Sequence, residues 1–367
     1  MKKALILIGS LLLSSVFFFG CGSLGSACGG ATVEPISANK PWNNSNNYEY
    51  ASYDVTRYAA VQDESGRYVE SDEDATGTYT TELFTLRENI YESEIVTQIG
   101  SVSEYFTNEL LNKNALSSTA GWYSVLFTEY ELNYESGKTD TQSSVVLFKT
   151  SSLLPVFSAK TVNYETSGLT YTATSDYVNK INYFESSETG GKVETELREE
   201  DGSFDNELLY HVVRAHTSLI QGGSSTISMR NAVYTGLNNA EEYRTMVFQV
   251  AEGDYTITGI DPDKNGFVSR YFEEGDIKYN ESDGKDENGN DIVKGYEIPC
   301  YYTSMAYSNN NSGPPKYLFY SASGFDYVGD TTSKVLLQTI DYEMDAEGVV
   351  SHMNVMKIKD YKTSKNM

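Results

Sequence analysis

The sequence predicts a mainly β protein built around a large antiparallel sheet. Polar and apolar residues alternate with a period of two in many short runs, glycine-containing pairs separate several of these runs, and the chain holds 30 Tyr against 15 Phe and 2 Trp. Alternation indicates strands with one buried and one solvated face, and Tyr is enriched in such half-buried strands. The glycine-containing pairs are typical of the turns that join antiparallel neighbours.

The strands can be placed one by one from this alternation. Runs with a period of two predict strands at 78–87, 145–149, 156–164, 169–174, 226–234, 243–250, 255–260, 296–307, 316–321, 334–344 and 349–359. Turns are predicted at Thr189-Gly190-Gly191, Gly222-Gly223, Asn288-Gly289-Asn290 and Glu347-Gly348. The pattern therefore predicts a sheet of many strands.

Helical spacing is clear in one segment, 205–215. Its apolar residues Leu208, Leu209, Val212 and Val213 fall about one turn apart, and Asp205 stands where an N-cap is expected. A weaker candidate is 102–112, where Tyr105, Phe106, Leu110 and Leu111 could share a face. We therefore expect one or two short helices beside the sheet.

The N-terminus predicts export and lipidation. Met1-Lys2-Lys3 precede an apolar run from Ala4 to Phe19, and Gly20-Cys21 follow it. Such a segment resembles the lipobox of bacterial lipoproteins, so we expect residues 1–20 to be removed as a signal peptide and Cys21 to carry the lipid. Cys28 is a second candidate for the lipid, and an ordinary secretory signal is the other alternative.

The rest of the chain divides into a tether and a domain. Residues 21–47 are rich in Gly, Ser, Asn and Pro, which predicts a flexible tether, and residues 48–367 carry the strand pattern of a single β-rich extracytoplasmic domain. The protein would then be anchored to the bacterial membrane by the lipid on Cys21. The sequence leaves open whether the host envelope is of the Gram-positive or the Gram-negative type.

Charge and cysteine content limit the partners. The formal net charge of −25 repels nucleic acid and anionic lipid headgroups, so we expect no nucleic-acid partner and no anchor besides the lipid. If Cys21 is acylated, Cys28 and Cys300 remain, and whether they pair is left open.

Sites for metals or catalysis are weakly indicated. Asp261, Asp263 and Asn265 match the start of a calcium-binding loop, but Phe272 stands where the bidentate Glu is needed. A hairpin turn is the alternative interpretation, and we expect no cofactor beyond this calcium candidate. The three histidines, His211, His216 and His352, suit structural positions, and the sequence lacks the usual hydrolase motifs. A hydrolase built on two carboxylates stays an alternative because their spacing cannot be recognised in sequence.

Three segments carry a family resemblance: Lys149-Thr150-Ser151-Ser152-Leu153-Leu154-Pro155, the helix of 205–215, and Gly313-Pro314-Pro315-Lys316-Tyr317-Leu318-Phe319-Tyr320-Ser321. They resemble an uncharacterised family of bacterial envelope proteins and lipoproteins whose fold is similar to the open half-barrel of the LolA and LolB lipoprotein carriers. The resemblance implies a large curved, half-barrel-like antiparallel sheet with short helices packed on its concave face. It also implies an apolar concavity between sheet and helix.

Two functions follow as hypotheses. The first is a non-enzymatic, membrane-tethered protein that binds an apolar or lipidic ligand, with Leu208, Leu209, Val212 and Val213 lining or plugging the concavity; a filled core is the other interpretation of these four residues. The alternative function is a surface module that recognises carbohydrate or protein through clustered tyrosines. The two clusters are Tyr48, Tyr50 and Tyr53, and Tyr301, Tyr302 and Tyr307.

Overall fold

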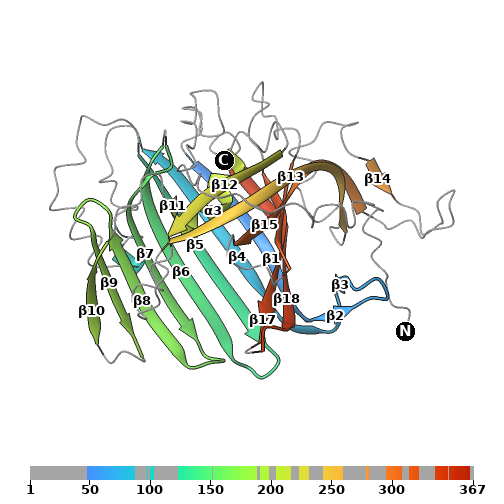
Figure 1. Cartoon of the computed structure of the whole chain (residues 1–367), viewed down its shortest axis with the longest axis horizontal. Coiled ribbons are helices and arrows are strands. Elements are labelled where there is room, and N and C mark those ends of the chain that lie inside the picture. Colours follow the sequence, from blue (N-terminus) through green and yellow to red (C-terminus); the bar gives the residue numbers. More distant parts are fainter. Residues whose placement is uncertain are drawn as a thin grey trace, which may run out of the picture.

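One large sheet dominates the fold and curves around a short helix (Figure 1). The structure is a computed structural model, and it describes residues 48–86, 97, 100–102, 123–150, 152–187, 191–197, 204–215, 223–230, 243–258, 278–280, 295–307, 314–321, 335–345 and 347–363. Within these residues the mainly β class and the large antiparallel sheet are confirmed.

The main sheet has sixteen strands, and a separate hairpin is formed by β2 and β3. The elements, in chain order, are β1 (Tyr48–Ala59), β2 (Val61–Gln62), β3 (Tyr68–Val69), β4 (Glu73–Leu86), β5 (Tyr123–Tyr134), β6 (Thr139–Lys149), β7 (Pro155–Tyr164), β8 (Leu169–Asp176), β9 (Ile181–Ser186), β10 (Lys192–Glu196), β11 (Phe204–Asp205), the 3₁₀ helix η2 (Asn206–Leu208), the helix α3 (Leu209–Ala215), β12 (Gly223–Arg230), β13 (Tyr243–Thr258), β14 (Lys278–Asn280), β15 (Gly295–Tyr307), β16 (Lys316–Ser321), β17 (Leu336–Met344) and β18 (Val350–Thr363).

The strand order brings the two ends of the chain together. It runs β10-β9-β8-β7-β6-β5-β4-β1-β18-β17-β16-β15-β13-β12-β11, with β14 beside β15, so the first strand and the last strand are neighbours near the middle. All pairs of this order are antiparallel except the short parallel pair of β11 and β12. The end strands β10 and β11 are not paired with each other, so the sheet is open.

Sequence alternation located many of the strands, but it predicted no run at β1, β9 or β10, and it misjudged two other regions. The strand β5 begins with six consecutive buried residues, because both of its faces are covered there, and so it shows little alternation. The runs 243–250 and 255–260 form the single strand β13, because the ladder to β15 continues through the pairing of Gly253 with Cys300. The predicted turn at Glu347-Gly348 joins β17 to β18, and Gly348 adopts a φ of 79° that favours glycine.

The predicted helix at 205–215 is also present. The carboxylate of Asp205 accepts a hydrogen bond from the backbone N–H of Glu207 at 2.9 Å, so this residue caps η2, and α3 follows directly. Of the second candidate, 102–112, only residue 102 is described; it is helical, as are residues 97, 100 and 101. Residues 103–112 lie outside the described part of the chain.

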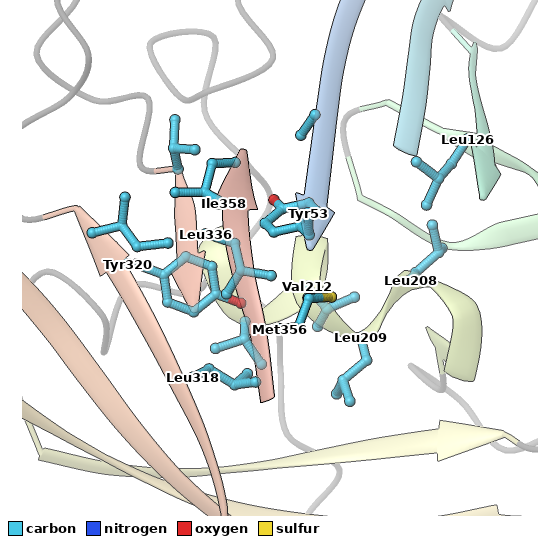
Figure 2. Close-up of a cluster of buried hydrophobic side chains, with 14 of the residues drawn as sticks. Tyr53, Leu126, Leu208, Leu209, Val212, Leu318, Tyr320, Leu336, Met356 and Ile358 are labelled. Carbon is cyan, nitrogen blue, oxygen red and sulfur yellow. The ribbon is translucent and has the colours of Figure 1, made fainter. Parts of the chain in front are cut away.

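The largest hydrophobic core lies between the sheet and α3 (Figure 2). It combines Leu208 and Val212 of the helical segment with residues of β1, β5, β16, β17 and β18, among them Tyr53, Leu126, Leu318, Leu336 and Met356. A second cluster contains Val125, Phe127, Val145, Leu147 and Phe157. Along their strands these residues alternate with residues that face the helix, such as Leu126 and Val146. The central strands are therefore covered on both faces.

Candidate functional site

A cleft of about 540 Å³ lies between the helical segment and the sheet. Asn206, Glu207, Leu209 and Tyr210 of η2 and α3 form one wall, and the rest is formed by Thr166 and by side chains of β1, β4, β5, β6, β7, β16, β17 and β18. The volume falls in the range of about 300–1,000 Å³ that is typical of small-molecule sites. We therefore treat this cleft as the candidate functional site.

Strand register builds the sheet wall of the cleft as rows of opposed residues. One row crosses seven strands from β17 to β7 through successive pairs: Thr339, Met356, Val55, Gly77, Leu132, Asp140 and Tyr164. All of these except Gly77 line the cleft. A Cβ at Gly77 would collide with the backbone of Glu131, so this close approach of β4 and β5 requires glycine.

Five tyrosines contribute to the lining: Tyr79, Tyr130, Tyr134, Tyr164 and Tyr210. Burial, followed by the nearby Tyr210 and Glu207, raises the pKa of Tyr79 well above its ordinary value. Burial and the hydrogen bond to Asp140 raise the pKa of Tyr134 to about 12, and burial also raises the pKa of Tyr130 and Tyr164. These four hydroxyls therefore stay protonated at neutral pH and can donate hydrogen bonds.

Three cations line the cleft, and each is paired with a carboxylate. The Lys160 Nζ lies 2.9 Å from Glu207 Oε1, and the Lys316 Nζ lies 2.8 Å from Asp341 Oδ2. Arg57 lies 2.9 Å from Glu343 Oε2 and also contacts Asp74. Burial alone would lower the pKa values of Lys160 and Lys316, but their carboxylate partners raise both pKa values above the ordinary value. The cations are therefore charged and neutralised in place.

Polar contacts fix the helical segment against the sheet on both sides. The pair of Lys160 and Glu207 joins η2 to β7, and the Tyr320 hydroxyl donates a 2.8 Å hydrogen bond to the carbonyl of Tyr210. The Arg214 guanidinium donates to Glu49 at 2.8 Å, and the Tyr361 hydroxyl donates to the same carboxylate at 3.0 Å. The cleft wall formed by the helical segment is thus held to β1 and β16 besides β7, and Tyr361 of β18 supports the Glu49 carboxylate.

A second cavity lies beneath α3 and is too small for a ligand. Its volume is about 20 Å³, and its lining includes Glu49, Tyr53, His211, Arg214 and Tyr361. A space of this size accommodates about one water molecule. Burial, followed by the charge of Arg214, lowers the pKa of His211 well below its ordinary value, so this histidine is neutral in the folded protein.

The four apolar residues predicted to line or plug the concavity do not share one role in the structure. Leu208, Val212 and Val213 are fully buried in the core, and Leu209 is the member that lines the cleft. Ligand binding by these residues therefore stays a prediction, and only Leu209 is placed to contact a ligand in the cleft.

The tyrosine cluster at the start of β1 does not form one surface. Tyr53 is buried in the core beside Tyr79, with ring centroids 5.9 Å apart, whereas Tyr48 packs on Phe84 at 5.1 Å. Tyr50 is half-buried with the Lys362 ammonium 5.1 Å from its ring centroid. Tyr301, Tyr302 and Tyr307 belong to β15, but their side chains lie outside the described part of the structure.

Other predicted sites fall outside the described residues: Cys21, Cys28, His216, and the calcium candidate Asp261, Asp263 and Asn265. Among the residues that the structure describes, no cluster of three or more His, Cys, Asp or Glu could hold a metal ion. Cys300 is buried and forms no disulfide within the described residues. In the same part of the chain, no helix combines the length and the apolar character needed to cross a membrane.

The sequence interpretation missed most of the cleft. Its tyrosines and charged residues come from strands far apart in the chain, and their common location depends on register. The period of two in Tyr130, Leu132 and Tyr134 is one signal that could have identified β5 and a Tyr-lined face. The pairing of Arg57 with Glu343, 286 positions apart, has no such local signal.

Comparison with known proteins assigns no activity. No family model matches the chain, and no curated protein matches it. The structure is similar to the crystal structure of a β-barrel-like protein of the domain of unknown function DUF1849 from Brucella abortus. The TM-score is 0.41 at 8% sequence identity, and the match covers 87% of this chain and 98% of that chain.

Proposed function

We propose that this protein is a membrane-tethered, non-enzymatic lipoprotein of the bacterial envelope that binds carbohydrate in the cleft. The make-up of the lining supports this most directly, because five tyrosines stand among amides, hydroxyls and paired charges. Tyr offers an apolar ring face for the C–H face of a sugar and a hydroxyl for its oxygens. The size of the cleft suits a short oligosaccharide better than a protein partner.

An apolar or lipidic ligand fits this lining less well. Its hydrocarbon would cover the ion pairs of Lys160, Lys316 and Arg57 without replacing the hydrogen bonds of water, which costs free energy. All four aliphatic residues predicted to contact such a ligand belong to the core cluster, and only Leu209 also lines the cleft. We therefore keep the half-barrel of the LolA and LolB carriers as the proposed shape of this protein, and we propose a more polar ligand for it.

The proposal of a non-enzymatic role is supported by the state of the cleft carboxylates. Asp140 accepts hydrogen bonds from Tyr134, from the Thr166 hydroxyl at 2.6 Å and from the Thr166 N–H. Glu343 is bound by Arg57 and Asn354, which outweigh the effect of burial and lower its pKa, so it is unsuited to act as a general acid near neutral pH. These carboxylates are held as structural acceptors.

Binding by the tyrosine face can be tested with Tyr130→Leu. Tyr130 lines the cleft, and no described residue forms a hydrogen bond with its hydroxyl. The full chain, purified in detergent, is first screened on a glycan array, and the affinity for the best oligosaccharide is then measured by calorimetry. We expect Tyr130→Leu to weaken binding about 10-fold through loss of the ring and the hydroxyl.

The matched control is Tyr183→Leu in β9, which changes a half-buried tyrosine outside the cleft. It should leave the affinity unchanged. An array without bound glycans would contradict the proposed function, as would equal affinities for Tyr130→Leu and the wild-type chain.

Membrane tethering rests on the sequence of the N-terminus and has its own test. We expect Cys21→Ser to abolish incorporation of radiolabelled palmitate and to move the protein from the membrane to the soluble fraction. Cys28→Ser is the matched control, because this cysteine lies seven positions further on, and it should keep both label and location. Loss of the label in Cys28→Ser, with the label kept in Cys21→Ser, would show that Cys28 carries the lipid.

A further inference from the structure

We infer that the cleft selects an uncharged oligosaccharide and discriminates against acidic sugars. This inference rests on the proposed function and adds the chemical class of the ligand. It follows from which groups in the cleft are already occupied by protein contacts and which are left for a ligand.

The charged groups are occupied by each other. The three cations contact Glu207, Asp341 and Glu343 at 2.8–2.9 Å. The cationic side chains are largely buried, with Arg57 14% and Lys160 18% exposed. A ligand carboxylate or sulfate could bind a cation only by competing with a carboxylate that is already in place. Such exchange gains little, because one ion pair is broken for each one formed.

The fourth cleft carboxylate is satisfied without a cation. Asp140 is buried and accepts three hydrogen bonds, from Tyr134 and from the N–H and hydroxyl of Thr166. Four carboxylates and three cations line the cleft, which leaves a negative surplus. This surplus repels anionic saccharides, and the acidic surface of the whole chain acts in the same direction.

The groups left for a ligand are neutral amides and hydroxyls. The Oδ1 atom of Asn354 is buried without a hydrogen-bond partner among the described residues, while its Nδ2 donates to Glu343 at 2.6 Å. Gln142 accepts from the Tyr164 hydroxyl through Oε1, and no described residue binds its Nε2. Asn206 also lines the cleft from η2, and its side-chain amide has no hydrogen bond within the described chain.

Two of these neutral groups stand side by side. Tyr130 of β5 is directly opposite Gln142 of β6, and Tyr79 is opposite Tyr130 on the other side. Directly opposed residues on one face of a sheet have their Cβ atoms about 5 Å apart. A ring face, a hydroxyl and an amide donor therefore lie within the span of one sugar ring, and none of them carries a charge.

The test compares saccharides of similar length and different charge. Calorimetry on the full chain in detergent uses maltohexaose, cellohexaose and hexa-N-acetylchitohexaose as neutral probes and hexagalacturonate as the anionic probe. We expect binding of a neutral probe, with an affinity that stays constant between about 50 and about 500 mM salt, because no net charge is neutralised on binding. Hexagalacturonate should not bind.

The positioned amide is tested with Gln142→Glu, which keeps the acceptor for Tyr164 but replaces the donor by a negative charge. We expect the affinity for the neutral probe to fall about 3- to 10-fold, which corresponds to one lost hydrogen bond. Gln62→Glu in β2 is the matched control at an exposed strand position outside the cleft, and it should bind as the wild-type chain does.

The outcomes separate this inference from the proposed function. Binding of hexagalacturonate with an affinity that falls at high salt would overturn the selection for uncharged sugars, while carbohydrate binding itself would stand. Wild-type affinity in Gln142→Glu would also overturn it. Absence of binding to every saccharide, on the array and in solution, would overturn the proposed function and the inference together.

Discussion

Arg214→Met is expected to lower the free energy of unfolding by about 3–5 kcal/mol. Arg214 of α3 and Glu49 of β1 form a buried ion pair with a 2.8 Å contact, and their side chains are 5% and 9% exposed. Removing the guanidinium leaves the Glu49 carboxylate buried, with the Tyr361 hydroxyl at 3.0 Å as its remaining hydrogen-bond donor among the described residues. An uncompensated buried carboxylate is among the largest single costs known for a point substitution. Chemical denaturation followed by circular dichroism measures this loss.

Two further variants separate the buried charge from the lost side chain. Arg214→Met combined with Glu49→Gln removes both charges, so it should recover part of the stability lost in the single variant. Lys359→Met breaks an exposed pair with Asp54, whose side chains are 51% and 59% exposed, and should cost less than about 1 kcal/mol. If Arg214→Met costs no more than Lys359→Met does, the buried pair does not hold α3 to the sheet.

Most of the secondary structure could be predicted from the sequence because the strands have one buried and one solvated face. The run 316–321 coincides with β16, and the run 156–164 differs from β7 by one residue. Asp205 was identified as an N-cap from residue type and spacing alone. Where both faces are buried, as in the first half of β5, the alternation disappears, and the local pattern does not show which side chains point to which face.

The cleft could not be predicted because its composition depends on the order of the strands. Arg57 meets Glu343 and Asn354 because β1 lies beside β18 and β18 lies beside β17. Nothing near residue 57 in the sequence indicates that the last two strands of the chain are its neighbours. Tyrosine content indicated a surface for recognition, but the tyrosines close together in sequence, Tyr48 and Tyr53, pack in different clusters.

The helix was predicted correctly, but its apolar face had two possible roles. An amphipathic pattern shows which residues face the sheet and does not show whether the space between them is filled. The structure fills that space at Leu208, Val212 and Val213, and the open volume begins at the side chains of Glu207, Leu209 and Tyr210. The site is therefore defined by polar residues of the same short segment together with Leu209.

Leu208→Ala is expected to lower the free energy of unfolding by about 3 kcal/mol and to leave ligand affinity unchanged. Leu208 is fully buried, and Figure 2 shows it pointing toward Leu126 of β5 within the main core. Truncation removes buried methyl groups and leaves a cavity that the surrounding strands can only partly close. Denaturation and calorimetry on the same preparation measure the two quantities separately.

The comparison with Leu209→Ala distinguishes core from site. Leu209 lines the cleft, so its truncation should weaken binding of the neutral oligosaccharide while costing less stability than Leu208→Ala. Val349→Ala, at a position 59% exposed beside the turn of β17 and β18, controls for removal of methyl groups in general and should change neither quantity by much. If Leu208→Ala abolished binding at full stability, the aliphatic face of the helix would be the ligand site, and the polar cleft would not be. Leu208 and Leu209 thus test whether one face of this helical segment packs in the core while the adjacent face contacts the ligand.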